Sequence, residues 1–303
     1  MKSVAVIILN WKQAQLTVNT VDSVLKVKKN PKFKYQIILV DNGSPDNSLE
    51  IFQKKYSKNK LITILNSGSN LGFSGGNNFG INFALKNNFD FLMLLNNDVL
   101  VDPSFIENLF AEINNYDIVG PKIYFAPGFE FHYNRYQKKD RGKVIWSVGG
   151  KIDWNNIYGS NIGIDEVDFG QFDQINEKVD FISGCCLMAT NKVFKKLKGL
   201  DENYFMYFED ADFCYRAKLL GFKMAYIPKS KIWHINSGST KGPGDLQNYF
   251  ITRNRLYFAF KYAKLRTKFA LLRESFRFLF SSKWQRRGVV DFYLKKMGKG
   301  TWQ

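Results

Sequence analysis

The chain has 303 residues, which is enough for one large domain or two small ones with a sizeable buried core. Hydrophobic residues make up 45% of it and aromatic residues 16%, which excludes a disordered protein. The formal net charge is +17 and is concentrated in residues 241–303, which hold 15 Lys or Arg against three Asp or Glu, so an anionic surface or polymer is the expected partner of that part.

Residues 1–120 alternate between strand-like and helix-like patterns. Short β-rich or apolar runs predict strands at 4–9, 35–40, 61–65, 91–95 and from 118 onward. Helical patterns predict helices at 13–28, 45–56, 77–86 and 103–114, the last with Asp102 as its N-cap. Repeated alternation of this kind predicts a parallel sheet with helices on both faces.

This rhythm is lost between residues 122 and 180, where Gly, Asn and aromatic residues dominate and antiparallel strands and loops are expected. Later patterns predict order at 179–189, helices at 191–198 and 209–220, a strand at 223–227 that ends at Pro228, and basic helices from 245 onward. The expected fold is therefore α/β, with a mostly parallel sheet, a smaller antiparallel part and a helical C-terminal extension.

The three cysteines show neither metal-ligand spacing nor a disulfide framework, which is typical of a reducing compartment. The apolar run at 4–9 is too short for the core of a signal peptide, and no segment reaches the roughly 18 apolar residues that a spanning helix needs. We expect a cytoplasmic protein, with the option of binding the inner face of the cell membrane.

Polar side chains stand at the end of each of the first four predicted strands. They are Asn10, Asp41, Asn66 and the group Asn96, Asn97 and Asp98. Ligands bind just beyond the carboxyl ends of strands in an open α/β sheet, so these ends together predict a ligand site. Asp98 is expected to offer an oxygen to a hard divalent ion. For Asp41, a turn and a hydrogen bond to a base or ribose both remain open.

Residues 70–80 form a glycine-rich segment that leads into a predicted helix. Glycines permit close backbone approach, and the free N–H groups of a helix N-terminus favour anions. The segment matches neither the Walker A loop nor the Rossmann fingerprint, and a plain loop remains an alternative.

Three carboxylates, Glu209, Asp210 and Asp212, stand at the start of the predicted helix 209–220. Acids at this place stabilise the helix dipole, and Asp212 can pair with Arg216 four residues later. The aromatic residues just before them instead indicate a partly buried carboxylate, whose raised pKa suits a general base.

His234 is one of two histidines in the chain. A lone histidine is most often a surface or packed residue, but close in space to Asp98 it would complete a metal site. His132 lies in the irregular middle part and has no such context.

Together and in this order, the segments resemble the inverting family 2 glycosyltransferases with the GT-A fold, in their rhamnosyltransferase-like branch, over about residues 3–255. The similar segments are the first strand at 6–11, the nucleotide-base loop at 40–44, a branch-specific loop at 70–78, the metal motif at 96–98, the Glu-Asp motif at 209–212, His234, and the aromatic-Arg-Asn segment at 249–254. Many members have aspartate in place of Asn96, and an amide is the weaker ligand, which implies a lower metal affinity.

The resemblance implies roles for individual residues. Asp210 matches the general base of the Glu-Asp motif. The implied donor-binding residues are Asn10, Asp41, Asn42, Asn70, Gly72, Phe73, Asn77, Asn97 and Arg253. Ser183, Gly184 and Glu209 are the implied acceptor-binding residues. Asp98 and His234 are the implied metal ligands, with Asn96 acting directly or through water.

The resemblance further implies Mg²⁺ or Mn²⁺ as cofactor, dTDP-rhamnose or a UDP-hexose as donor, and a glycan or polyprenyl-diphosphate-linked acceptor. It implies a nucleotide-sugar-binding half at 1–120, an acceptor-binding and catalytic half at 121–240, and a basic aromatic extension at 241–303. The extension suits an anionic membrane surface, or else packs on its own domain with a solvated basic face. Residues 241–244 are expected to form a lid over the donor.

Two other function classes remain open from the residues alone. A nucleotidyltransferase also uses a glycine-rich loop and a metal carboxylate, but usually has Gly and Lys or Arg directly after its first strand, where this chain has residues 10–13. A nucleic-acid-binding protein would explain the basic charge. The acidic strand ends would repel its phosphates unless a metal intervenes, so no nucleic acid partner is expected.

Overall fold

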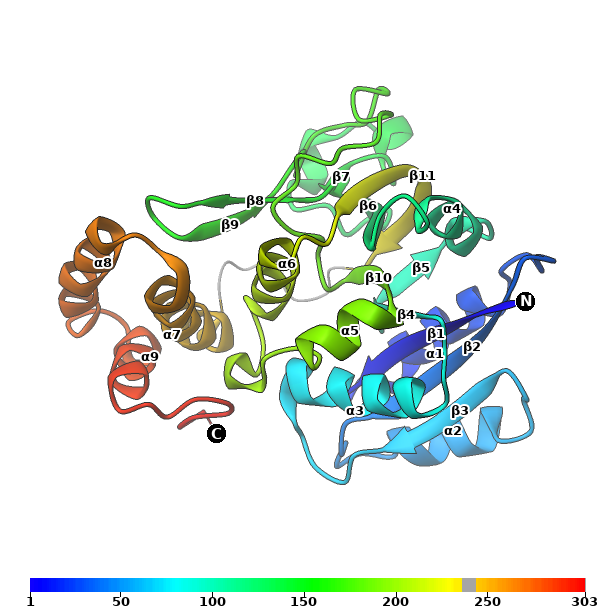
Figure 1. Ribbon diagram of the computed structural model, residues 1–303, viewed down its shortest axis with the longest axis horizontal. Coiled ribbons are helices and arrows are strands. Elements are labelled where there is room, and N and C mark those ends of the chain that lie inside the picture. Colours follow the sequence, from blue (N-terminus) through cyan, green and yellow to red (C-terminus); the bar gives the residue numbers. More distant parts are fainter. Residues whose placement is uncertain (236–243, 303) are drawn as a thin grey trace.

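One curled β-sheet forms the centre of the computed structural model, which describes residues 1–235 and 244–302 (Figure 1). Within these residues the sheet has nine strands in the order β3-β2-β1-β4-β10-β6-β11-β5, with β7 paired to β6. Its first half consists of four parallel neighbours, β1 (Lys2–Asn10), β2 (Phe33–Asp41), β3 (Ile62–Asn66) and β4 (Phe91–Asn96).

The second half of the sheet mixes strand directions. Its strands are β5 (Val99–Val101), β6 (Ile118–Phe125), β7 (Ile145–Ser147), β10 (Cys186–Thr190) and β11 (Met224–His234). β11 runs parallel to β6, β10 is antiparallel to both β4 and β6, and β5 is antiparallel to β11. A separate antiparallel pair, β8 (Gly150–Asp153) and β9 (Tyr158–Asn161), lies in the region where the helical rhythm is lost.

Helices cover both faces of the sheet. Alternate residues of β1 belong to two different cores, with Ala5 and Ile7 in one and Val6 and Ile8 in the other. The core of Val6 and Ile8 includes residues of α1 (Ala14–Val24), α2 (Ser48–Tyr56) and α4 (Phe105–Glu112). The opposite core includes residues of α3 (Gly72–Lys86), α5 (Asn191–Leu197) and α6 (Glu209–Leu219). Because β1 is buried on both faces, its sequence is an uninterrupted apolar run. Helices on both faces of a mostly parallel sheet confirm the predicted α/β fold.

The predicted helical extension is also confirmed. α7 (Asp245–Tyr262), α8 (Leu265–Phe278) and α9 (Lys283–Tyr293) gather at one side of the molecule, orange to red in Figure 1. Short 3₁₀ turns occur at η1 (Tyr133–Arg135), η2 (Lys138–Asp140) and η3 (Glu202–Tyr204). No helix in residues 1–235 and 244–302 is both long and apolar enough to cross a membrane.

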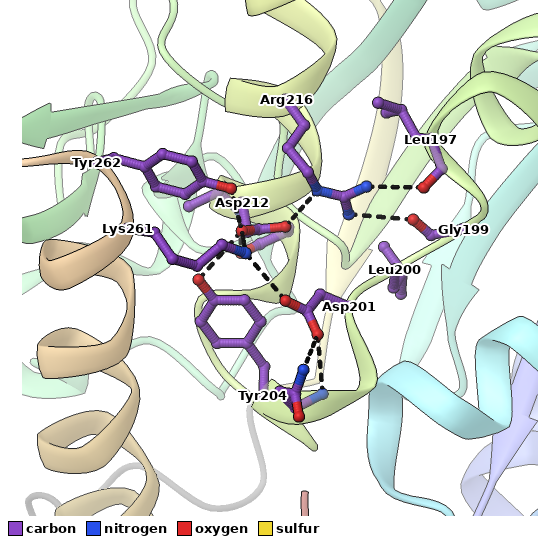
Figure 2. A network of polar contacts seen from close by, with 12 residues as sticks. Leu197, Gly199, Leu200, Asp201, Tyr204, Asp212, Arg216, Lys261 and Tyr262 are labelled. Carbon is purple, nitrogen blue, oxygen red and sulfur yellow. Dashed lines mark hydrogen bonds and ion pairs between the residues drawn. The ribbon is translucent and has the colours of Figure 1, made fainter. Parts of the chain in front are cut away.

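A fully buried carboxylate, Asp212, fastens α7 to α6 (Figure 2). Its two oxygens accept hydrogen bonds from Arg216 Nε at 2.5 Å, Lys261 Nζ at 2.6 Å, and the hydroxyls of Tyr262 and Tyr204 at 2.8 and 3.1 Å. The expected pair of Asp212 and Arg216 is therefore formed, but in the interior. Since Lys261 belongs to α7, this network connects the extension to the sheet domain.

We expect Asp212→Ala to lower the free energy of unfolding by about 3–5 kcal/mol, because Arg216 loses its buried counter-ion, Lys261 keeps only Asp201, and two tyrosine hydroxyls lose their acceptor. Urea unfolding followed by circular dichroism measures it. Lys55→Ala is the matched control, since it breaks the 2.6 Å ion pair of Lys55 with Asp22 at the surface, and the loss of unfolding free energy there is expected to stay below about 1 kcal/mol. Equal losses in the two variants would contradict this role of Asp212.

Several element boundaries differ from the sequence-based predictions. α3 begins at Gly72 rather than at 77, so most of the glycine-rich segment is helical. β11 continues past Pro228 to His234, because a register shift against β6 between Ile227 and Lys231 accommodates the proline. α1 ends at Val24 rather than at 28, and α4 begins after Ser104 rather than directly after Asp102. The lid predicted at 241–244 falls mainly outside the described residues.

Candidate active site

The polar ends of the first four strands lie side by side at one edge of the sheet. In the parallel register Asn10 is opposite Asp41, Asp41 is opposite Asn66, and Asn96 is opposite Leu9. Parallel strands bring their carboxyl ends to the same edge, so residues that are up to 87 positions apart, Leu9 and Asn96, meet there.

Asn10 and Asp41 form a buried support beneath this edge. The Asp41 carboxylate accepts from Asn10 Nδ2 at 2.9 Å and from the Ser44 backbone N–H at 3.0 Å. Asn10 Oδ1 accepts from Thr17 Oγ1 at 2.7 Å, and Asn97 Nδ2 donates to the same hydroxyl at 2.9 Å. Asn10 and Asp41, both predicted to bind the donor, are at most 1% exposed and lie behind the surface of the cleft.

The turn that precedes α3 is held by Asn42. Its Nδ2 donates to the Gly72 carbonyl at 3.0 Å, and its Oδ1 accepts from the Leu71 backbone N–H at 3.1 Å. Gly72 has a φ of +73°, and a Cβ there would lie 2.4 Å from the ring of Phe205, so only glycine fits. Asn77 is buried and donates to the Phe73 carbonyl within α3, away from the surface.

Above these supports lies a cleft with two adjoining parts. One part, of about 380 Å³, is lined by Asn42, Asn70, Gly72, Phe73, Asn97 and Asp98 among others, and is named the nucleotide part after the donor binding predicted for the first five. The other part, of about 660 Å³, is lined by Asn96, Asp98, Ser183, Gly184, Glu209, Asp210 and His234 among others, and is named the catalytic part after the general base predicted at Asp210. Asp98 and Phe73 line both parts, so the two cavities meet at these side chains.

Strand pairing brings His234 to Asp98. β11 ends at His234, which is opposite Val99 of β5, and the Ile235 backbone N–H donates to the Asp98 carbonyl at 2.7 Å. His234 Nε2 consequently lies 3.2 Å from Asp98 Oδ1. The ring of Trp146 packs edge-on against the imidazole, with centroids 4.7 Å apart.

Asp98 and His234 have the chemistry of a divalent cation site. In the described part of the chain, Asp98 Oδ1 and His234 Nδ1 are buried and make no hydrogen bond, since the 3.2 Å approach of His234 Nε2 to Asp98 Oδ1 lacks hydrogen-bond geometry. A carboxylate oxygen and an imidazole suit Mg²⁺ or Mn²⁺, which take few protein ligands and complete their shell with water and phosphate. No group of three or more His, Cys, Asp or Glu residues suited to a metal occurs within residues 1–235 and 244–302.

Asp210 faces the catalytic part of the cleft from the first turn of α6. Its Oδ2 accepts from the Gly184 backbone N–H at 3.0 Å, and its Oδ1 accepts from the Ala211 backbone N–H at 2.8 Å. Burial raises the pKa of Asp210 above its ordinary value, although these two N–H groups lower it in part. The residue as a whole is partly exposed and lines the cavity.

Glu209, beside it, is 6% exposed, and its Oε2 is a buried oxygen with no partner in the described part of the chain. Burial, and then the neighbouring Asp210, raise the pKa of Glu209 well above the ordinary range. At the same wall, Ser183 Oγ accepts from the Cys185 backbone N–H at 3.2 Å. The predicted acceptor-binding residues thus lie around Asp210.

The segment before α6 has a strained backbone. Phe205, Tyr207 and Phe208 have φ angles of 63°, 66° and 73°, a region that bulky residues rarely adopt. Asn254 of α7 holds it, because its Nδ2 lies within 2.9 Å of three carbonyls, those of Tyr204, Met206 and Tyr207. The aromatic-Arg-Asn segment therefore fixes the turn that leads into Glu209 and Asp210.

The structure does not bring Arg253 into the cleft, contrary to the expected contact with a diphosphate. Arg253 is fully buried, and its Nη2 donates to the carbonyls of Asn203 and Tyr204 at 3.2 and 3.1 Å. The rings of Tyr249 and Phe250 pack against its guanidinium. A cation so enclosed stabilises the fold around the cleft instead.

Other cleft residues were not found from the sequence. The catalytic part also contains Asn161, Phe181, Trp146 and Tyr207, and the nucleotide part contains Lys12, Gln13, Phe205, Lys299 and Trp302. Lys12 and Gln13 closely follow the end of the first strand, and this position could have identified them from the sequence. Asn161, Phe181, Lys299 and Trp302 lie in segments without a readable pattern.

The family model described as glycosyl transferase family 2 matches residues 3–198, which is more than half of the chain. The chain belongs to glycosyl transferase family 2. The predicted family is thereby confirmed, and with it the prediction of a transferase.

Relatives of this family 2 member include two curated glycosyltransferases. Low-salt glycan biosynthesis hexosyltransferase Agl10 of Haloferax volcanii is 27% identical over 223 residues, which cover 71% of this chain and 61% of the relative. N-acetylglucosaminyl-diphospho-decaprenol L-rhamnosyltransferase of Mycobacterium tuberculosis is 25% identical over 221 residues, which cover 67% of each chain. The match thus spans about three-fifths to two-thirds of these relatives.

Two solved structures share the fold. GalNAc-T7, solved with UDP, GalNAc and Mn²⁺, has a TM-score of 0.64 at 17% identity over 84% of this chain and 47% of its own. Mannosyltransferase PcManGT from Pyrobaculum calidifontis, solved with GDP-Man and Mn²⁺, has a TM-score of 0.56 at 12% identity over 96% of this chain and 74% of its own. These likenesses confirm the predicted GT-A fold.

Proposed function

We propose that this protein is an inverting glycosyltransferase that moves a sugar from a nucleoside diphosphate sugar to an acceptor hydroxyl. The observation that carries the proposal is that Asp98, with His234, and Asp210 line one cavity. A group that holds a diphosphate and a group that accepts a proton then flank the same substrate. The 660 Å³ volume of that part of the cleft suits a sugar and part of an acceptor.

The donor, dTDP-rhamnose or a UDP-hexose, would bind across both parts of the cleft. Asn42, Asn70, Gly72, Phe73 and Asn97 line the nucleotide part. Asn10 and Asp41 support the segment 11–13 from below. The hexosyl- and rhamnosyltransferase names of the relatives favour these donors.

Asp98 and His234, with Asn96 directly or through water, would hold Mg²⁺ or Mn²⁺. Bound there, such an ion offsets the negative charge that develops on the leaving diphosphate. Asp210 takes the proton of the acceptor hydroxyl while the oxygen forms a bond to the anomeric carbon. The bond from that carbon to the diphosphate breaks on the opposite side, so a single displacement inverts the anomeric configuration.

Ser183, Gly184 and Glu209 would position the acceptor beside Asp210. Burial favours the protonated form of Glu209, and a protonated carboxyl donates a hydrogen bond to a sugar hydroxyl. The name of the mycobacterial relative points to a polyprenyl-diphosphate-linked glycan as one class of acceptor.

Product analysis tests the proposed function. The full chain is incubated with Mn²⁺, a panel of UDP-, dTDP- and GDP-sugars, and lipid-linked or soluble glycan acceptors. Release of a nucleoside diphosphate together with a product of inverted anomeric configuration, assigned by NMR, is the expected result. Release of pyrophosphate from a nucleoside triphosphate and a sugar phosphate would instead identify a nucleotidyltransferase.

The exposed face of α8 suits the membrane on which such a lipid-linked acceptor lies. Four large apolar residues, each 58–90% exposed, follow one another along this face and just beyond it: Leu265, Phe269, Phe276 and Phe280. Arg266, Arg273 and Arg277 are interspersed among them and are exposed. An apolar stripe with flanking arginines fits an anionic lipid surface, and we propose that α8 lies in that interface.

We expect the double variant Phe269→Ser/Phe276→Ser to bind vesicles of phosphatidylglycerol and phosphatidylcholine at least tenfold more weakly, since burying one Phe is worth roughly 1.5–3 kcal/mol. Flotation of the full chain with these vesicles measures the change. Phe169→Ser is the matched control, because Phe169 is 84% exposed but lies outside α8. Unchanged flotation of the double variant would contradict a membrane role of α8.

A further inference from the structure

Residues 296–302, which follow α9, form one wall of the nucleotide part of the cleft. Lys299 and Trp302 line this cavity together with Trp11 and Lys12 from the opposite end of the chain. Figure 1 shows the red segment after α9 running back toward the sheet domain. A cavity that is expected to hold the donor is therefore closed by a segment more than 190 residues beyond the strand ends that line it.

Hydrogen bonds hold this segment in place. The Thr301 backbone N–H and hydroxyl both donate to Asp291 Oδ2 of α9, at 2.8 and 2.7 Å. The Gly298 backbone N–H donates to the Asn203 carbonyl at 2.9 Å. Arg253 Nη1 of α7 donates to the Lys296 carbonyl at 3.4 Å. The segment is thus anchored at three points to α7, α9 and the turn near α6.

Close packing fixes its path further. Gly300 has a φ of +58°, and a Cβ there would lie 2.1 Å from Tyr249 Oη, so a side chain at this position would displace the segment. The Trp302 ring packs against Trp284 with centroids 4.4 Å apart and against Tyr249 at 5.8 Å. These contacts pack the segment closely against α7 and α9, so its position beside the cleft is fixed by the fold.

Charge indicates what the wall contacts. Among the described residues that line the nucleotide part, the charged side chains are Lys12, Lys299 and Asp98. A nucleoside diphosphate carries two or more negative charges, and Asp98 is already assigned to the cation that accompanies them. The two lysines are then the groups of this cavity that complement the phosphates directly.

We propose that the segment 296–302 is part of the donor site and that the Lys299 ammonium binds the diphosphate of the nucleotide. This inference rests on the proposed function, since it requires that the cleft binds a nucleoside diphosphate. It assigns a donor-binding role to a part of the chain that lies beyond the residues matched to family 2, which end at 198.

Calorimetric titration of the full chain with UDP, dTDP and GDP, each with Mn²⁺, tests the proposal. For the nucleotide that wild type binds most tightly, Lys299→Glu is expected to raise Kd roughly tenfold. Lys295→Glu is the matched control, because it makes the same charge change at an exposed lysine that directly precedes the segment and does not line the cleft. Its Kd is expected to stay within about twofold of wild type.

Gly300→Ala gives a second measurement that leaves Lys299 in place. It is expected to weaken binding of the same nucleotide by a similar factor, because the displaced segment carries Lys299 away. Adding Lys299→Glu to Gly300→Ala should then raise the Kd of the nucleotide little further, since the effects of coupled changes are not additive. If the two changes raised Kd by fully additive free energies, Gly300→Ala would not be acting through the position of Lys299, and this inference would be contradicted.

The outcomes separate the two proposals. If wild type binds none of the three nucleotides with Mn²⁺, the proposed function is overturned and this inference falls with it. If wild type binds a nucleotide and Lys299→Glu binds it no more weakly than Lys295→Glu, the role of the segment is overturned while the proposed function stands.

Discussion

Asp210→Asn is expected to lower kcat by roughly 10²–10⁴-fold, the usual contribution of a positioned general base. The amide keeps the size of the side chain but cannot take the proton of the acceptor hydroxyl. Binding of the nucleotide sugar, measured by calorimetry with Mn²⁺, is expected to stay within about twofold, because Asp210 lines the catalytic part of the cleft and not the nucleotide part. Turnover is measured as nucleoside diphosphate released in the presence of acceptor.

The pH dependence of kcat distinguishes the loss of a general base from a general disturbance of the fold in Asp210→Asn. Because burial raises the pKa of Asp210, wild-type kcat is expected to rise with pH through a range above that of an ordinary aspartate, and the residual rate of Asp210→Asn should lack this rise. Asp22→Asn, at a partly exposed carboxylate outside the cleft, is the control. A kcat near that of wild type would refute the assignment of Asp210.

Stability gives an independent check on the same variant. A pKa that is raised in the folded state means that stability is lost as pH rises through that pKa, so ionised Asp210 opposes folding at neutral pH. The amide introduced by Asp210→Asn carries no such charge, although its single oxygen can accept from only one of the two backbone N–H groups. A large drop in melting temperature is therefore not expected, and inactivity with an unchanged melting curve supports the catalytic role.

Asp98→Ala is expected to weaken Mn²⁺-dependent binding of the nucleotide sugar by roughly 100-fold, because a metal on a diphosphate is worth several kcal/mol and Asp98 is the carboxylate proposed to hold it. Calorimetric titration with the donor, in Mn²⁺ and again in excess chelator, measures the change. Wild type should lose affinity in chelator, whereas Asp98→Ala should bind equally weakly in both conditions.

Histidine variants provide a matched comparison for the same site. His234→Ala is expected to lower the Mn²⁺ dependence of donor binding by a smaller factor, since a neutral imidazole contributes less than a carboxylate. His132→Ala should change nothing, because His132 is exposed and contacts Asp165 away from the cleft. Donor affinity of Asp98→Ala that still responds to chelator as wild type does would contradict the proposed cation site.

Much of the site could be predicted from local sequence, because it depends on where strands end. An apolar run that stops at Asn10, Asp41 or Asn96 indicates both a buried strand and the edge at which it emerges. Parallel pairing then brings these ends together without further information. The predictions for the fold, the family and the grouping of Asp98 with Asp210 rest on this regularity and on the motif order.

The role of Arg253 could not be predicted in the same way. An arginine in a helix can face solvent, ligand or interior, and only the packing of Tyr249 and Phe250 around it decides for the interior. The same holds for Asp212, whose acid-rich helix start suggested a surface pair, whereas the arrival of Lys261 from α7 encloses it (Figure 2).

The sequence by itself determined the alternation of strands and helices, the polar strand ends and the order of the motifs, because each depends on neighbours within about ten residues. Only the tertiary structure decided that β11 passes Pro228 to bring His234 to Asp98, and that residues 296–302 return to line the cleft. These features depend on contacts between segments more than 100 residues apart, and no periodicity in the chain encodes which distant surface a segment will meet.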